Sequence, residues 1–94
     1  MKFLHHEFNA GPDDMIRVTL DSQANVLLLD SGNFARYRSG QSFRYQGGLA
    51  TQSPYNLSPP HYGTWHVVID VGGGSGSVRA SVQLISQAQS SYPW

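Results

Sequence analysis

The most informative stretch of the sequence reads Met15-Ile16-Arg17-Val18-Thr19-Leu20-Asp21. Apolar and polar side chains alternate along it, which is the pattern of a strand with one buried face and one wetted face. The same alternation runs through most of the 94 residues, and turn residues interrupt it at short intervals. Helical periodicity is nearly missing. We therefore expect an all-β fold, a small antiparallel β-sandwich or flattened barrel that is jelly-roll-like and has one short helical turn around residues 31–39.

Strands are expected on both sides of this stretch. Residues 2–8 predict a first strand, which ends at the turn formed by residues 10–14. Residues 25–30 are apolar on both faces, as in a central strand that is covered on each side. Further strands are expected at residues 41–46 and 53–58. Gly47-Gly48 would separate these two, and Pro59-Pro60 would close the second, which marks it as an edge strand.

The helical stretch runs from Ser31 to Gly40. Ser31 or Asn33 is suited to cap its start, and Gly40 is suited to end it. Phe34 and Tyr37 are three residues apart and therefore share one face of the helix.

The last two strands predict a hairpin. Its first strand presents an apolar face made of Trp65, Val67, Ile69 and Val71, and its second strand presents one made of Val78, Ala80, Val82 and Leu84. Matching these faces pairs Val71 with Val78 and Trp65 with Leu84, and leaves Gly73-Gly74-Ser75-Gly76 as the loop. On the outer face, Asp70 would then lie opposite Arg79.

Length and composition limit the protein to one small core without covalent reinforcement. The chain has no cysteine, so neither a disulfide nor a thiolate metal site can stabilise it. We expect a single β domain over residues 1–85 and a flexible C-terminal tail over residues 86–94. Two histidines and a glutamate interrupt the start before any signal peptide could form, and the longest apolar run, Val26 to Leu29, is too short to span a membrane. A cytoplasmic location is the expectation.

The formal net charge is zero, which is unlike a dedicated nucleic-acid-binding protein. The charges are nevertheless unevenly placed, because residues 1–30 are acidic and residues 31–69 contain arginines without any acid. This basic segment suggests a ligand-binding cluster in which guanidinium groups and aromatic rings could hold an anionic small molecule, a nucleotide or a single-stranded nucleic acid. Its residues are Arg36, Tyr37, Arg38, Arg44 and Tyr45. The alternative is that Tyr37 belongs to the core and the arginines are simply solvated.

No catalytic constellation stands out. His5 and His6 are consecutive on a predicted strand and must point to opposite faces. A histidine metal site would require His5, His61 and His66 to converge through a sheet adjacency that the sequence does not reveal. The glycines at 72–76 lack the lysine of a phosphate loop and join two strands. We therefore expect no enzyme activity, no cofactor and no metal, and treat a histidine-based metalloenzyme as the remote alternative.

Several segments together resemble a known family. These are Met1-Lys2-Phe3-Leu4-His5-His6, Leu29-Asp30-Ser31, and above all Trp65-His66-Val67-Val68-Ile69-Asp70 with Val78-Arg79-Ala80-Ser81-Val82. Over about residues 1–85 the chain resembles the bacterial domain family numbered 1883 among domains of unknown function. Members of that family occur alone or beside signalling TIR domains, which implies a sensing or protein-interaction module.

Two functions are therefore expected in order of preference. The first is a non-enzymatic module that recognises a protein partner or a second copy of itself through its acidic first third and basic middle. The second is a binder of an anionic ligand at the arginine and tyrosine cluster, whose affinity would fall steeply with salt.

Overall fold

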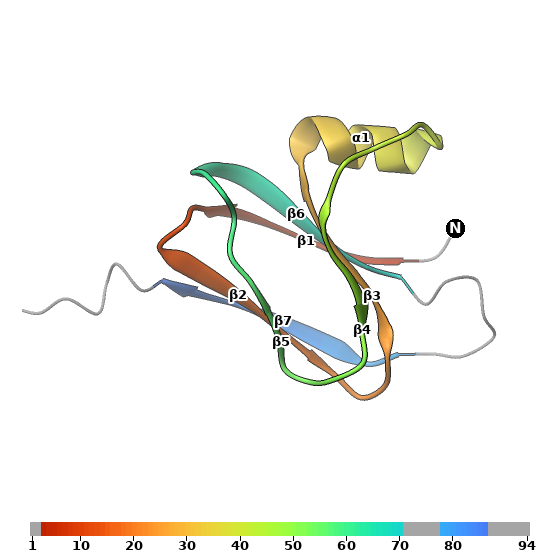
Figure 1. Cartoon of the computed structure of the whole chain (residues 1–94), viewed down its shortest axis with the longest axis vertical. Coiled ribbons are helices and arrows are strands. Elements are labelled where there is room, and N and C mark those ends of the chain that lie inside the picture. Colours follow the sequence, from red (N-terminus) through yellow and green to blue (C-terminus); the bar gives the residue numbers. More distant parts are fainter. Residues whose placement is uncertain (1–2, 71–77, 87–94) are drawn as a thin grey trace, which may run out of the picture.

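The computed structural model describes residues 3–70 and 78–86, which form two antiparallel sheets packed as a sandwich (Figure 1). The four-stranded sheet contains, in spatial order, β1 (Phe3–Ala10), β6 (Gly63–Asp70), β3 (Ala24–Asp30) and β4 (Gln46–Ala50). The three-stranded sheet contains β5 (Tyr55–Leu57), β2 (Asp14–Leu20) and β7 (Ala80–Ser86). The expected β-sandwich is confirmed.

The main core lies between the two sheets. The alternation that begins at Met15 places Ile16 and Val18 of β2 on this inner face, where both are fully buried. Val26 and Leu28 of β3 and Val67 of β6 meet them from the other sheet. Each strand thus contributes every second residue, which is the period that the sequence predicts.

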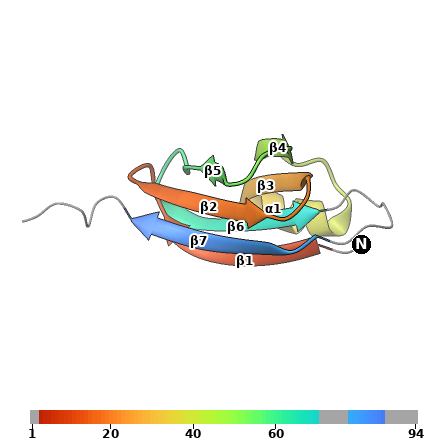
Figure 2. The same cartoon turned by 90° about the horizontal axis from the view of Figure 1, so that it is seen from below.

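A second, smaller core lies on the outer face of the four-stranded sheet, beneath helix α1 (Ser31–Ser39). In Figure 2, β2 and β7 lie in front of the four-stranded sheet and α1 lies behind it. Leu27 and Leu29 point to this face, opposite to Val26 and Leu28, so β3 is covered on both sides as expected. Phe34 and Tyr37 of α1 pack on them, which confirms that these two residues share the buried face of the helix.

The ends of α1 follow from local hydrogen bonding. Its N-cap is Asp30 and not Ser31 or Asn33, because the Asp30 carboxylate accepts a hydrogen bond of 2.8 Å from the backbone N–H of Asn33. Gly40 ends the helix as predicted, with a φ of 79° that an L side chain rarely adopts.

The segment after α1 differs from the prediction. Residues 41–45 are irregular, and the strand expected at 41–46 begins only at Gln46 and continues to Ala50. Gly47 and Gly48 lie inside this strand and not between two strands, because β4 approaches the backbone of β3 so closely that a Cβ on Gly47 would collide with the Val26 carbonyl oxygen. β5 is shorter than expected but does form an edge, as Pro59-Pro60 indicated.

The predicted final hairpin is wrong. β6 pairs with β1 and β3, whereas β7 pairs with β2 in the other sheet. Asp70 therefore does not face Arg79: Asp70 accepts a hydrogen bond from Tyr37, and the Arg79 backbone exchanges hydrogen bonds with Asp21. Most of the predicted inward residues do pack on the main core, Val67 from one sheet and Val82 from the other, whereas Leu84 is exposed.

Three expectations fall outside the described residues. The pairing of Val71, the loop at 73–76 and most of the tail at 86–94 lie in the segments 71–77 and 87–94. Within the part that is described, α1 is the one helix, and its nine residues are too few to cross a membrane.

Candidate functional site

A surface pocket of about 600 Å³ lies between the start of α1 and the irregular segment that follows the helix. Three hydrogen bonds define its wall. Asp30 accepts from both the backbone and the side-chain amide of Asn33, and the Oδ1 atom of Asn33 accepts from the backbone N–H of Arg44 at 2.8 Å. Asn33 thus connects the first turn of the helix to residues 42–44. Gly32 and Arg36 line the helix side of the pocket, and residues 42–44 line the opposite side.

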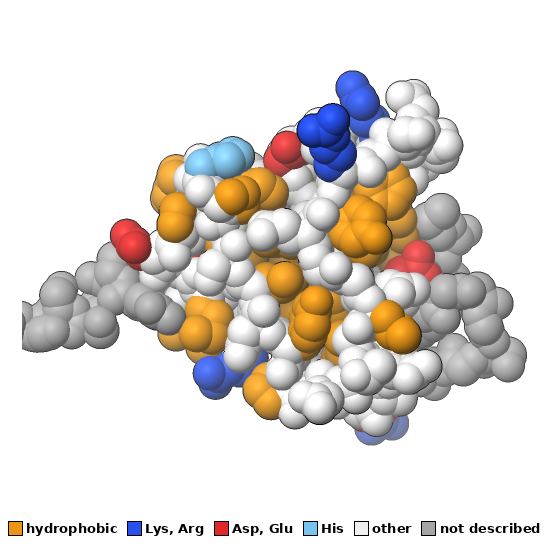
Figure 3. All heavy atoms as spheres, in the orientation of Figure 1, with side chains coloured by type: hydrophobic (Ala, Val, Ile, Leu, Met, Phe, Trp, Pro, Cys, Tyr) orange, Lys and Arg blue, Asp and Glu red, His pale blue; other side chains and the backbone are white. Residues whose placement is uncertain are grey.

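The lining of the pocket is basic, because it contains two arginines. Basic side chains gather over α1 at one end of the molecule, with one acidic side chain beside them (Figure 3). Arg36 and Arg44 both line the pocket, and neither guanidinium forms an ion pair with a residue in the described ranges. The acid that also lines the pocket, Asp30, already accepts two hydrogen bonds as the helix cap. The pocket therefore presents two guanidinium groups and one carboxylate, which is an excess of one positive charge.

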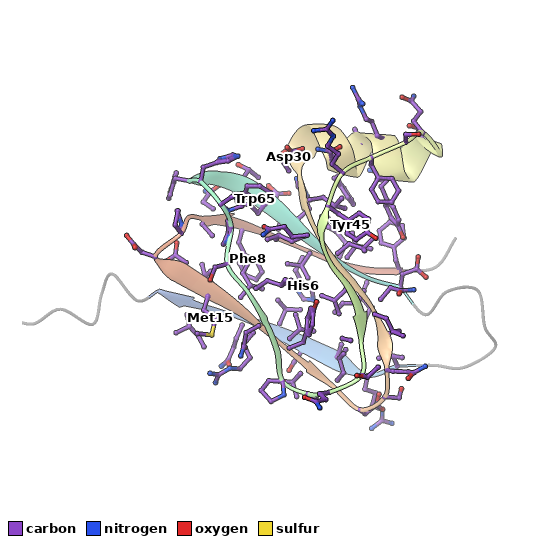
Figure 4. All side chains as sticks on the ribbon, in the orientation of Figure 1. His6, Phe8, Met15, Asp30, Tyr45 and Trp65 are labelled. Atoms are coloured by element: carbon purple, nitrogen blue, oxygen red, sulfur yellow. The ribbon has the colours of Figure 1, made fainter. Side chains whose placement is uncertain are left out.

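An adjoining hollow of about 260 Å³ shares Asp30, Asn33 and Arg44 with the pocket and adds aromatic walls. Tyr45, which is 50 % exposed, lines it together with Trp65. Figure 4 shows Asp30, Tyr45 and Trp65 in the half of the molecule that carries α1. The Trp65 indole N–H donates to the carbonyl of His61 at 3.0 Å, so this ring is held in place.

The other two residues of the predicted cluster lie elsewhere. Tyr37 is only 6 % exposed, and its hydroxyl donates to Asp70 at 2.8 Å; burial and then Asp70 raise the pKa of Tyr37 above its usual range. Arg38 points along another side of α1, with its guanidinium 5.8 Å from the centre of the Phe34 ring. The structure therefore brings Arg36, Arg44 and Tyr45 together and separates Tyr37 and Arg38 from them.

The histidines are divided between three places. His61 packs against Trp65, and His6 packs against Phe8 on β1. His5 and His66 meet on the outer face of the four-stranded sheet, because β1 and β6 are neighbours. Within residues 3–70 and 78–86, one group of side chains has a composition and spacing suited to a metal ion, namely His5, Glu7 and His66, whose ligand atoms all lie within 4.8 Å of one another.

Comparison with known protein families matches residues 1–88 to a domain of unknown function, DUF1883. The chain belongs to the DUF1883 family. Neither the curated proteins nor the solved structures contain a match to this DUF1883 domain. The resemblance found in the sequence is confirmed, and its extent agrees with the match to within three residues at the C-terminal end.

The sequence alone did not indicate the roles of two residues at the sites of this DUF1883 domain, Asn33 and Glu7. Asn33 was considered only as a helix cap, although its amide connects both walls of the pocket. Glu7 was not considered beside the histidines, although its separation of two residues from His5 places both on one face of a strand. That spacing was visible in the sequence, whereas the position of His66 opposite Glu7 requires the β1–β6 pairing.

Proposed function

We propose that this domain is a non-enzymatic binding module that recognises an anionic small molecule in the pocket between α1 and residues 42–44. The observation that carries the proposal is the presence of Arg36 and Arg44 on one pocket without a carboxylate partner in the described ranges. An anion there would form charge-assisted hydrogen bonds, which are about twice as strong as neutral ones.

A nucleotide is the ligand class that fits both hollows. Its phosphate would pair with Arg36 and Arg44, and its base would lie in the adjoining hollow against Tyr45 and beside Trp65. Stacking on an aromatic side chain contributes about 1–3 kcal/mol per base and tolerates different bases. Arg44 lines both hollows and would contact the ligand between its charged and its planar parts.

An amide chemical-shift titration with AMP, ATP and inorganic phosphate, at low and at raised salt, tests this proposal. We expect salt-sensitive shifts at residues 32–36 and 42–46, because the charged groups of an exposed pocket are screened by ions. Replacing Arg36 or Arg44 by glutamine should weaken nucleotide binding by about fivefold or more, since each change removes one charged hydrogen-bond donor group.

Arg38→Gln is the matched control, because it removes the same charge from the same helix but outside the pocket. The nucleotide affinity of Arg38→Gln should stay within about twofold of that of the unmodified protein. Tyr45→Leu should weaken binding of the nucleotides but leave phosphate unchanged. Spectra that do not shift with any of the three ligands, or an equal loss in Arg38→Gln and Arg44→Gln, would overturn the proposal.

Association with a protein partner is the second candidate, and exposed apolar residues favour it. Leu49 on β4, an edge strand of the four-stranded sheet, is 57 % exposed, and Tyr62 is 73 % exposed. Self-association through an acidic first third has less support, because the carboxylates of Asp14, Asp21 and Asp30 already accept hydrogen bonds from the chain. A molecular mass that rises with protein concentration would favour association over the nucleotide pocket.

A further inference from the structure

His5, Glu7 and His66 form a second polar cluster on the outer face of the four-stranded sheet, apart from the arginine pocket. His5 and Glu7 are two residues apart on β1 and therefore lie on the same face. β6 runs antiparallel beside β1 and places His66 directly opposite Glu7. The side chains of two strands that are about sixty residues apart in the chain thus converge on one point.

The two imidazoles face each other edge to edge. His5 Nε2 lies 2.8 Å from His66 Nδ1, whereas the ring centres are 5.0 Å apart and the ring planes differ by only 13°. The two nitrogens are joined by a hydrogen bond in which one ring donates and the other accepts, so both nitrogens are directed at the space between the two rings. Glu7 completes the cluster, since one ligand atom from each of His5, Glu7 and His66 lies within 4.8 Å of the other two.

The surroundings hold this arrangement in position. The other ring nitrogen of His66, Nε2, is hydrogen-bonded to the hydroxyl of Ser31 at 3.0 Å, which orients the ring and leaves Nδ1 directed at His5. Phe34 of α1 stacks on both imidazoles, at 4.2 Å from His5 and 4.5 Å from His66, and so lies over the gap between them. His66 is buried, while His5 and Glu7 are open to solvent.

We propose that this cluster is a binding site for a divalent transition-metal ion, with His5 Nε2, His66 Nδ1 and a Glu7 carboxylate oxygen as its ligands. Two imidazole nitrogens and one carboxylate suit Zn²⁺, Cu²⁺ or Ni²⁺, and do not suit Mg²⁺ or Ca²⁺, which prefer oxygen ligands. Three protein ligands leave a fourth position of a tetrahedral Zn²⁺ for water or another small ligand. The site has no residue in common with the arginine pocket, so it stands or fails independently of the proposed function.

To admit the ion, the hydrogen bond between His5 Nε2 and His66 Nδ1 must break and the Glu7 carboxylate must close on the two imidazoles. With Zn–N bonds of about 2.0–2.1 Å and tetrahedral angles, the two nitrogens would be about 3.3 Å apart, so the side chains must separate by roughly half an ångström. His5 and Glu7 are exposed on an edge strand and can make this adjustment while the buried His66 stays in place.

The charge state of the imidazoles agrees with this role. Burial lowers the pKa of His66, as does its neighbour His5, and the carboxylates of Glu7 and Asp30 act in the opposite direction. Burial also lowers the pKa of His5, where Glu7 opposes the shift and His6 and Arg38 add to it. Metal ions bind the neutral imidazole, and burial of the two rings favours that form.

Isothermal titration of the metal-free full chain with ZnCl₂, followed in parallel by the imidazole ¹⁵N resonances, tests the proposal. We expect one Zn²⁺ per chain with a dissociation constant of about 10 μM or below. The zinc-induced shifts should fall on His5 Nε2 and His66 Nδ1. MgCl₂ should produce none of these changes.

The variants His5→Gln and Glu7→Gln are at exposed positions and should fold, and each should weaken Zn²⁺ binding about tenfold or more. Ser31→Ala removes the hydrogen bond to His66 and should weaken binding by about 10-fold while leaving the stoichiometry unchanged. His6→Gln is the matched control, because it removes an imidazole from the adjacent position on the opposite face of β1. No heat of binding at millimolar zinc, or binding that is lost equally in His6→Gln, would overturn the proposal.

Discussion

Tyr37 had two interpretations from the sequence, a ligand contact and a core residue, and it lies in the core beneath α1. It lies between two arginines, which suggested a ligand contact, but its ring is buried between Phe3 and Phe43 and its hydroxyl donates to Asp70. A hydrogen bond from a buried hydroxyl to a carboxylate contributes about 1.5–3 kcal/mol. We therefore assign Tyr37 to the attachment of α1 to β6 and not to the binding pocket.

Tyr37→Phe is predicted to lower the free energy of unfolding by about 1–3 kcal/mol at neutral pH, because Asp70 loses a donor. The effect depends on pH. Burial and Asp70 raise the pKa of Tyr37 in the folded state, so the folded protein retains a proton that the unfolded chain loses above about pH 10. The free energy of unfolding of the unmodified protein should fall as the pH rises beyond that value. In Tyr37→Phe, the decrease that is due to deprotonation of Tyr37 should be absent.

Urea unfolding at pH 7 and at alkaline pH measures both effects. Tyr62→Phe is the control, since Tyr62 is 73 % exposed and no hydrogen bond of its hydroxyl is present among the described residues. Equal changes in Tyr37→Phe and Tyr62→Phe would show that the Tyr37 hydroxyl is not linked to Asp70.

Among the elements, β4 departs most from its predicted form. Its pairing with β3 places Gly47 against the backbone of Val26 and Leu27, and a side chain has no space there. The two glycines that suggested a loop are in fact what allows the strand to form, because Gly47 lets the two backbones approach closely and both residues have a positive φ that an L side chain rarely adopts. Local sequence favours a turn at this position, and the hydrogen bonds to β3 override that preference.

Gly47→Ala is predicted to destabilise the protein by about 2–4 kcal/mol, because the added methyl group collides with the Val26 carbonyl and the φ of 112° is unfavourable for alanine. Gly48→Ala has the same kind of φ, 143°, but its Cβ would meet no atom within 4 Å, so it should cost about half as much or less. Thermal unfolding of both variants gives the comparison. A smaller loss in Gly47→Ala than in Gly48→Ala would contradict the close approach of β3 and β4.

At the scale of the whole molecule, the decisive feature is that β6 and β7 belong to different sheets. β6 lies between β1 and β3, and β7 lies beside β2. This arrangement brings His66 to His5 and Glu7, and it places Asp70 where it accepts a hydrogen bond from Tyr37. A hairpin of β6 and β7 would remove β7 from β2 and leave that edge of β2 without its hydrogen-bonding partner.

Paired cysteines test this topology, and the chain has no native cysteine to interfere. Thr19 and Ser81 are direct partners on β2 and β7, and both are exposed. Partners in an antiparallel pair are about 4.5–5.5 Å apart at Cα, which suits a disulfide. We expect Thr19→Cys with Ser81→Cys to cross-link within one chain under mild oxidation, as judged by non-reducing electrophoresis and mass.

The pair Asp70→Cys with Arg79→Cys serves as the contrast, because the rejected hairpin would have placed these two residues opposite each other. It should not cross-link within the folded chain. Cross-linking of this pair together with failure at Thr19 and Ser81 would restore the hairpin.

Some residues of the candidate sites could be predicted from nearby sequence, whereas others depend on contacts between distant elements. Arg36 and Arg44 could be named from the sequence because they lie in one basic segment that has no acid. The role of Asn33 and the convergence of His5 with His66 could not be named, because they depend on contacts between elements.

The amino-acid sequence by itself determined the all-β class, the helix over residues 31–39 and the inward faces of β2 and β6. These follow from the alternation of apolar residues and from the glycine that ends the helix at Gly40, which involve neighbours only a few residues apart. The tertiary structure alone decided which strands are partners. Val67 and Val82 would share a core either as neighbours in a hairpin or across a sandwich, so the apolar pattern is the same in both cases. The hairpin and the sandwich differ in the backbone pairing of β6, which pairs with β1 and β3. This long-range pairing also brings His5, Glu7 and His66 together.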